Sequence, residues 1–94
     1  MPNRESKIEK YLHDEVERLG GTSRKWVSPG RAGVPDRIVF YKSKVFFVEI
    51  KTVDGAVSQV QVREIDRLRS FGADVSVVYG HEGVDNFINT IRCT

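Results

Sequence analysis

The sequence predicts one α/β domain whose elements follow the order α-β-β-β-α-β-α. Apolar residues recur at helical spacing in three segments, and runs rich in β-branched and aromatic residues lie between them. The chain has 94 residues, which suits one domain and leaves no room for a separate recognition domain. The single domain, 1–94, or a second copy of it must therefore make all the contacts with any binding partner.

The first element is expected to be a helix over about residues 4–19. Ile8, Leu12, Val16 and Leu19 recur at helical spacing, and Gly20-Gly21 supplies the stop. At about 100° per residue, Glu5 falls within this apolar stripe. A carboxylate is therefore expected to point toward the core side of the helix.

Residues 22–27 read as a strand and 28–33 as a loop, since glycines and a proline exclude regular structure there. Two β-rich runs, 36–41 and 45–51, are separated by Lys42-Ser43-Lys44, which favours a β-hairpin. The side-chain period of two puts Glu49 and Lys51 on the same face of the second run.

The second helix has clear start and stop signals. Ser58 and Gln61 fit an S-x-x-Q capping box, and Gly72 ends the segment. Its buried stripe is expected to consist of Val62, Ile65, Leu68 and Phe71, with Gln61 also facing inward. A strand over 75–79 and a short closing helix, with Val84, Phe87, Ile88 and Ile91 on its apolar face, complete the order.

Composition excludes several classes of protein. No apolar run approaches the eighteen or so residues of a membrane span, and no signal peptide follows Met1. Cys93 is the only cysteine, which excludes an internal disulfide and suits a cytoplasmic protein, in the host cell if the chain is viral. Between Gly21 and Val48, six basic residues accompany a single acid, Asp36, a pattern that suits a phosphate backbone held beside a bound cation.

The chemistry is expected where the two strands of the hairpin meet. Antiparallel pairing would bring Asp36 and Glu49 together, and two adjacent carboxylates repel each other unless a cation lies between them. Oxygen ligands suit Mg²⁺ or Mn²⁺, and the Ile50 backbone carbonyl could add another. Lys51 would then contact a scissile phosphate, which indicates metal-assisted phosphodiester hydrolysis. Glu5 and Gln61 could assist by orienting water, lysine or a second cation.

Each of these residues also has a simpler explanation. Glu49 and Lys51 could form an exposed ion pair worth at most about 1 kcal/mol. Gln61 could serve only the capping box, and Glu5 could only favour the positive end of a helix dipole. The basic residues could be ordinary solubilising charge.

With these motifs in place, the chain resembles the VRR-NUC family of the PD-(D/E)XK nuclease superfamily. The resemblance rests on the segment 31–37 (RAGVPDR), the triplet Glu49-Ile50-Lys51 and the run 58–61 (SQVQ) at the head of the next helix. The family's glutamate on the first helix falls on Glu5. The combination, in order and with suitable spacing, is more specific than any one motif.

The resemblance implies a restriction-endonuclease-like core with a mixed four-stranded sheet flanked by helices. It also implies a divalent-metal nuclease in which Asp36, Glu49 and the Ile50 carbonyl bind metal, while Lys51, Gln61 and Glu5 assist. Stand-alone members are similar to junction resolvases that act as two-fold dimers, so a homodimer is expected.

The leading hypothesis is a structure-selective endonuclease for branched DNA, such as Holliday junctions, in replication, recombination or repair. Phosphate contacts are expected from basic residues spread over the chain, namely Arg24, Lys25, Arg31, Arg37, Arg63 and Arg67. Two alternatives remain open, a non-catalytic DNA-binding module and a sequence-specific restriction-type nuclease.

Overall fold

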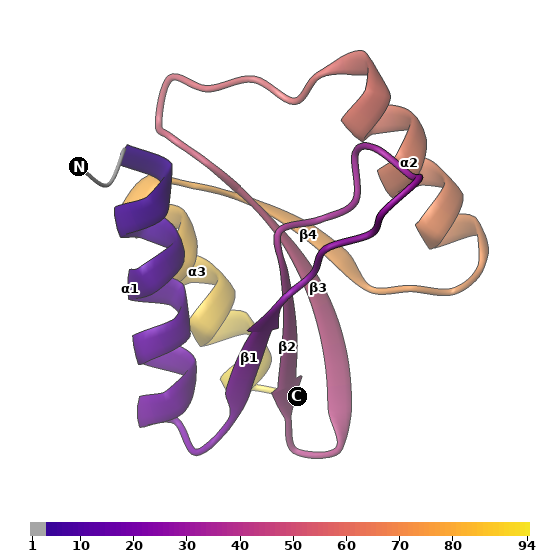
Figure 1. Ribbon diagram of the computed structural model, residues 1–94. Helices are drawn as coiled ribbons and strands as arrows, with labels where there is room; N and C mark the ends of the chain where they lie inside the picture. The colour runs from indigo at the N-terminus through magenta and orange to yellow at the C-terminus, as the bar shows by residue number, and fades with distance from the viewer. Residues whose placement is uncertain (1–3) are drawn as a thin grey trace.

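The computed structural model describes residues 4–94, and its elements follow the expected order. In sequence they are α1 (Arg4–Arg18), β1 (Thr22–Lys25), β2 (Arg37–Tyr41), β3 (Lys44–Lys51), α2 (Gln59–Ser70), β4 (Val75–Tyr79) and α3 (Gly80–Arg92). The four strands form one sheet in the order β1-β2-β3-β4 (Figure 1). The first two pairings are antiparallel and β3 pairs with β4 in parallel. The predicted mixed four-stranded sheet is therefore confirmed.

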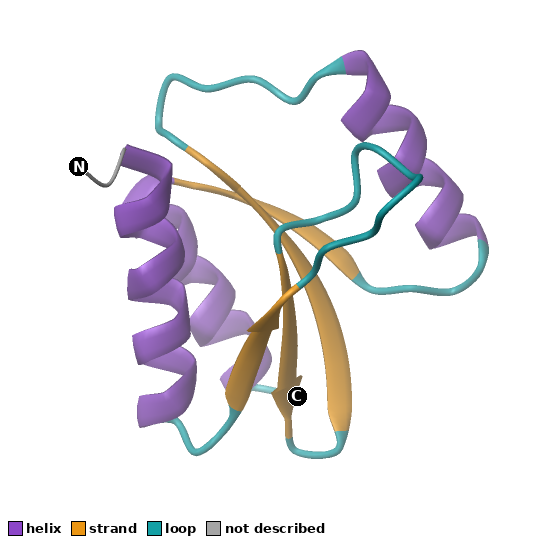
Figure 2. Ribbon diagram, in the orientation of Figure 1, coloured by secondary structure: helices purple, strands orange, loops and turns teal. Residues whose placement is uncertain are grey.

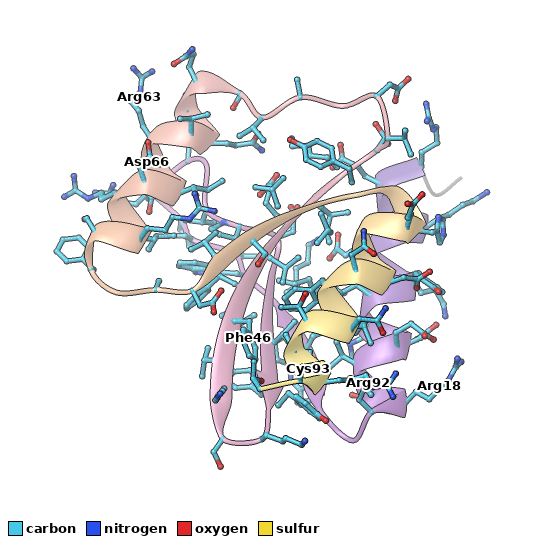
Figure 3. The ribbon with its side chains drawn as sticks, turned by 180° about the vertical axis from the view of Figure 1, so that it is seen from behind. Arg18, Phe46, Arg63, Asp66, Arg92 and Cys93 are labelled. Carbon is cyan, nitrogen blue, oxygen red and sulfur yellow. The ribbon has the colours of Figure 1, made fainter. Side chains whose placement is uncertain are left out.

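Helices cover the sheet unequally. The helices α1 and α3 lie side by side against one face, whereas α2 lies on the other side of the sheet, beside the loop that joins β1 to β2 (Figures 1 and 2). Figure 3, seen from behind, shows Phe46 between the sheet and α3. The main apolar core joins α1, the sheet and α3 through Ile8, Leu12, Val16, Val39, Phe46, Val48, Ile50, Val78, Val84, Phe87, Ile88 and Ile91.

The β2–β3 hairpin is confirmed, with a tighter turn than the sequence suggested. Tyr41 pairs with Lys44, so only Lys42 and Ser43 form the turn. Both have positive φ angles, 49° and 64°, as the two central residues of a type I′ turn require. This turn fixes the register at the other end of the hairpin, where Asp36 and Glu49 lie.

Strand β1 ends earlier than the expected residue 27. The Trp26 N–H still donates to the Asp36 carbonyl at 3.0 Å. One step further along this register, Val27 would face Pro35 at a non-hydrogen-bonded position, and a turn closed by the Arg31 N–H and the Ser28 carbonyl follows directly. The chain therefore leaves the sheet and forms a loop that returns to Asp36.

The predicted buried stripe of α2 is wrong at both of its ends. Val62 is 40% exposed and Phe71 is 78% exposed, whereas Glu64 and Ile65 are buried. The helix is rotated so that Gln61, Glu64, Ile65 and Leu68 face inward, at the spacing of one helical face. The helix has this orientation because α2 packs partly against the polar loop before Asp36. Within residues 4–94, no helix has both the length and the apolar character needed to cross a membrane.

Candidate active site

Asp36 and Glu49 lie opposite each other at the open end of the hairpin. Arg37 pairs with Val48 in the antiparallel register, so the next pair outward consists of Asp36 and Glu49. Directly opposite residues of antiparallel strands project from the same face of the sheet. The negative charge of Asp36 accordingly helps to raise the pKa of Glu49. The structure therefore places these two residues opposite each other, as the hairpin predicted.

Glu49 is the most deeply buried charged group of the site. It is 1% exposed, and burial, followed by the charge of Asp36, raises its pKa to about 7, against the opposing effect of Lys51. Its Oε2 accepts a hydrogen bond from Gln61 Nε2 at 2.9 Å and lies 3.4 Å from Lys51 Nζ. Within residues 4–94, its Oε1 is buried without any hydrogen-bond partner. Such an orphaned acceptor is costly and requires an explanation.

Asp36 is held by the strand that carries Glu49. Its Oδ2 accepts a hydrogen bond from the Ile50 N–H at 2.7 Å. Burial raises the pKa of Asp36, and this backbone hydrogen bond opposes the effect. In an antiparallel strand the N–H and C=O of one residue face the same side, so the Ile50 carbonyl also faces the side of Asp36.

These oxygen donors fit a hard divalent cation. The unpartnered Oε1 of Glu49 and the mutual repulsion of two partly desolvated carboxylates are both relieved by a cation between them. The donor set of two carboxylates and a carbonyl is of the type that Mg²⁺ and Mn²⁺ prefer. Within the described part of the chain, no three histidine, cysteine, aspartate or glutamate side chains converge as a metal site. The Ile50 carbonyl would therefore be the third protein oxygen of such a site, with water completing the coordination.

Gln61 serves the helix cap and the candidate site at the same time. Its Oε1 accepts from the Ser58 N–H at 2.9 Å, and its N–H donates to Ser58 Oγ at 3.2 Å, which completes the capping box. Its Nε2 donates to Glu49. The two explanations suggested by the sequence are thus compatible, because each uses a different atom of the amide.

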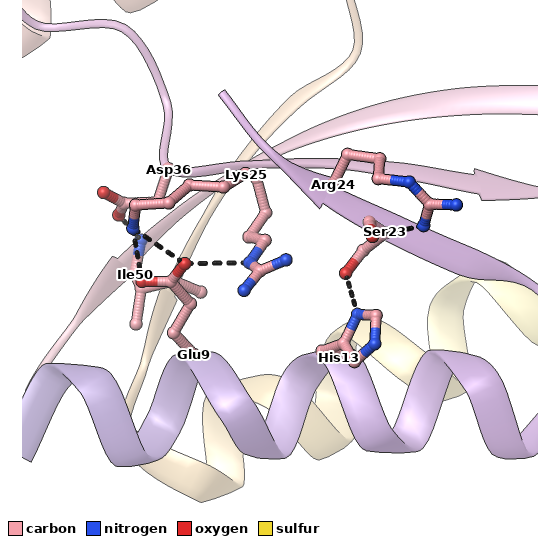
Figure 4. Close-up of polar contacts among 8 residues, drawn as sticks. Glu9, His13, Ser23, Arg24, Lys25, Asp36 and Ile50 are labelled. Carbon is pink, nitrogen blue, oxygen red and sulfur yellow. Dashed lines mark hydrogen bonds and ion pairs between the residues drawn. The ribbon is translucent and has the colours of Figure 1, made fainter. Parts of the chain in front are cut away.

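Two glutamates of α1 lie near the carboxylates. Glu5 is partly buried, and its charge raises the pKa of both Asp36 and Glu49. Glu9, which was not predicted from the sequence, accepts a hydrogen bond from Lys25 Nζ at 3.2 Å (Figure 4) and another from Arg37 Nε at 2.8 Å. Its charge also acts on Asp36. The available signal was its position one helical turn after Glu5, which puts both acids on one face.

The basic residues expected to contact DNA differ in whether their side chains are already paired within the protein. Lys25 and Arg37 are paired with Glu9, and Arg31 is paired with Glu64. Arg24 donates to Thr22 Oγ1 and to the Ser23 carbonyl. Arg63 and Arg67 are exposed on α2, and Arg63 points away from the body of the protein in Figure 3. Among residues 4–94, neither of these α2 arginines forms an ion pair, so they are the freest of the set.

Comparison with known proteins identifies the family. The model of the VRR-NUC domain matches residues 3–82. The protein named "Putative nuclease p44" of Acyrthosiphon pisum secondary endosymbiont phage 1 is 46% identical over 76 residues, which cover 80% of this chain and 82% of that protein.

Solved structures agree with this match. A structure described as a VRR_NUC domain superposes with a TM-score of 0.85 at 36% identity, covering 93% of this chain and 96% of the other. The Holliday junction resolvase Hjc of the archaeon Archaeoglobus fulgidus superposes with a TM-score of 0.61 at 20% identity, covering 80% of this chain and 67% of the resolvase, and thus shares the fold. The chain described here is therefore a nuclease of the VRR-NUC family.

Proposed function

We propose that this nuclease is a Mg²⁺- or Mn²⁺-dependent endonuclease that hydrolyses phosphodiester bonds of branched DNA, such as four-way junctions, in replication, recombination or repair. The observation that carries the proposal is the buried Glu49 beside Asp36, with one carboxylate oxygen that has no hydrogen-bond partner among residues 4–94 and the other next to Lys51. The preference for branched DNA is supported by the shared fold with a Holliday junction resolvase.

In this proposal each side chain has a defined task. Asp36, Glu49 and the Ile50 carbonyl hold the cation, which when bound would polarise the phosphate and lower the pKa of water. Lys51 contacts the phosphate and stabilises the negative charge that develops on its oxygens. Gln61 keeps Glu49 in place through its amide, and Glu5 orients water at the rim of the site. The exposed Arg63 and Arg67 contact phosphates of the flanking DNA, which would select shape more than base sequence.

The replacement Lys51→Ala tests this proposal. We expect it to lower the cutting rate by roughly 100-fold to 1000-fold, as for loss of one group that stabilises transition-state charge. Labelled junction, flap, single-stranded and linear duplex DNA would be incubated with Mg²⁺ or Mn²⁺, and the junction should be cut fastest. Lys44→Ala is the matched control, because Lys44 begins the same strand at the opposite end.

Several outcomes of this experiment would contradict the proposal. Equal cutting by the wild type and Lys51→Ala would exclude the candidate site as the source of the activity. Metal-independent DNA binding without cleavage would instead indicate a non-catalytic binding module. Discrete fragments from plain linear duplex would indicate a sequence-specific restriction-type nuclease.

We also propose that the protein acts as a homodimer, so that two sites address two strands symmetrically. Phe71 at the end of α2 is 78% exposed, and its burial against a second copy would contribute roughly 1.5–3 kcal/mol. Light scattering at micromolar concentration should give the mass of two chains, and Phe71→Ser should shift the population toward one. A single-chain mass for the wild type would contradict the dimer.

A further inference from the structure

The loop of residues 28–35 is attached to α2 by two contacts one helical turn apart. Arg31 Nη1 lies 3.1 Å from Glu64 Oε1, and the Glu64 side chain is only 7% exposed. Gly33 has a φ angle of 85°, and a Cβ built there would lie 2.8 Å from the Val60 carbonyl oxygen. Only glycine tolerates this combination of positive φ and close approach. The loop is therefore held at a fixed distance from the helix.

The same loop and the same helix carry two residues of the candidate site. Asp36 follows the buried Pro35 and lies three residues after Gly33. Gln61 lies on α2 between the two contact positions, Val60 and Glu64, and its amide donates to Glu49. The contacts that fix the position of the loop on α2 therefore also fix the position of Asp36 relative to Gln61 and Glu49.

Glu64 is unusual for an acid on a surface helix. Its carboxylate is almost fully buried, and a buried carboxylate is costly to keep unless it is paired. A solubilising role is excluded by this burial. Contact with DNA is excluded for the same reason, so any effect of Glu64 on cleavage must pass through other groups.

We infer that Arg31 and Glu64 form a positioning pair that aligns Asp36 with Glu49 through the loop, and that Arg31 does not act mainly as a phosphate contact. This inference rests on the proposed function. In this role the pair keeps Asp36 in place beside Glu49, where the two carboxylates would share a cation. Groups that orient metal ligands typically change metal affinity or activity by about 10-fold to 100-fold when removed, and we expect this pair, which acts through the loop, to fall within that range.

Glu64→Gln separates positioning from DNA contact. We expect kcat to fall roughly 10-fold to 100-fold with KM for DNA nearly unchanged, and the Mn²⁺ affinity of the DNA-free protein to fall by a similar factor. Mn²⁺ binding would be followed by electron paramagnetic resonance, which requires no catalysis. If Arg31 instead contacts phosphate, removing its acidic partner would free it, and Glu64→Gln would leave kcat unchanged or tighten DNA binding. That result would overturn the inference.

Further variants complete the experiment. In the Glu64→Gln background, Arg31→Met should lower kcat little further, because both residues act through one contact. Additive losses would contradict the pair. Gly33→Ala should lower Mn²⁺ affinity through the second contact, and wild-type affinity in this variant would contradict the role of the loop.

Glu15→Gln is the matched control, since Glu15 pairs with Arg18 on α1, and it should leave all readouts unchanged. Absence of cutting by the wild type would refute the proposed function. If the wild type cuts DNA and Glu64→Gln cuts equally fast, the proposed function stands and only this inference is refuted.

Discussion

Replacing Glu49 with glutamine is expected to abolish cleavage while making the metal-free protein more stable at neutral and alkaline pH. If Glu49 holds the cation as proposed, the neutral amide cannot supply the required charge, and we expect the cutting rate to fall on the order of 1000-fold or more. The gain in stability has a different cause. The Glu49 carboxylate is buried beside Asp36, so its ionisation in the folded state is unfavourable.

The pH dependence of this stability difference follows from the raised pKa. The pKa of Glu49 is raised from 4.5 to about 7 in the folded protein, so the folded state binds more protons between these values. The free energy of unfolding of the wild type therefore falls as pH rises through this window. Above pH 7 the difference from Glu49→Gln should approach about 3 kcal/mol, and below pH 4.5 it should vanish.

Thermal or urea unfolding from pH 4 to pH 9, in the presence of EDTA, measures this difference. The matched control is Glu82→Gln, which replaces an exposed acid of α3 and should change stability little at any pH. Added Mn²⁺ should stabilise the wild type and leave Glu49→Gln unchanged. A variant that is less stable than the wild type at pH 8, or that still cuts DNA, would disprove this account of Glu49.

Local patterns in the sequence were sufficient for the element order and the hairpin. The helical stripe of α1, the capping box at Ser58 and the β-rich runs each report on residues close together in the chain. The meeting of Asp36 and Glu49 could also be predicted, because a hairpin register determines which residues face each other.

The orientation of α2 could not be derived in the same way. Its apolar residues suggested a stripe ending at Phe71, yet the helix faces inward with Gln61, Glu64 and Ile65. The deciding contacts come from the loop before Asp36, which is about thirty residues away in sequence. Periodicity within a helix cannot anticipate a partner of this kind, nor could it show that Arg31 is paired with a buried acid.

Glu9 was missed for a related reason. Its partners, Lys25 and Arg37, come from two different strands that become neighbours only in the folded sheet. Sequence position does not show which basic residues are paired, whereas the fold pairs Lys25, Arg31 and Arg37 with acids and leaves Arg63 and Arg67 without an ion pair among residues 4–94. The exposed Arg63 and Arg67 are therefore a better first choice for DNA-contact mutagenesis than Arg37, whose side chain is largely covered.

The cutting rate at a limiting metal concentration should depend steeply on pH. In the proposed mechanism protons and the cation compete for Glu49, whose pKa burial raises to about 7. At a fixed, subsaturating Mn²⁺ concentration, the cutting rate should fall about 10-fold for each pH unit below 7 and level off above it. EDTA should abolish cutting, and added Mn²⁺ should restore it.

The decisive feature is the response of this profile to metal concentration. Raising Mn²⁺ should move the midpoint to lower pH, because the cation displaces the proton from the same carboxylate. DNA binding, measured in parallel without metal, should not share this midpoint. Lys51→Ala provides the internal control, since it should cut far more slowly yet still bind Mn²⁺ with a pH dependence set by Glu49. A flat profile between pH 5.5 and pH 8.5 at low Mn²⁺ would show that Glu49 does not hold the cation.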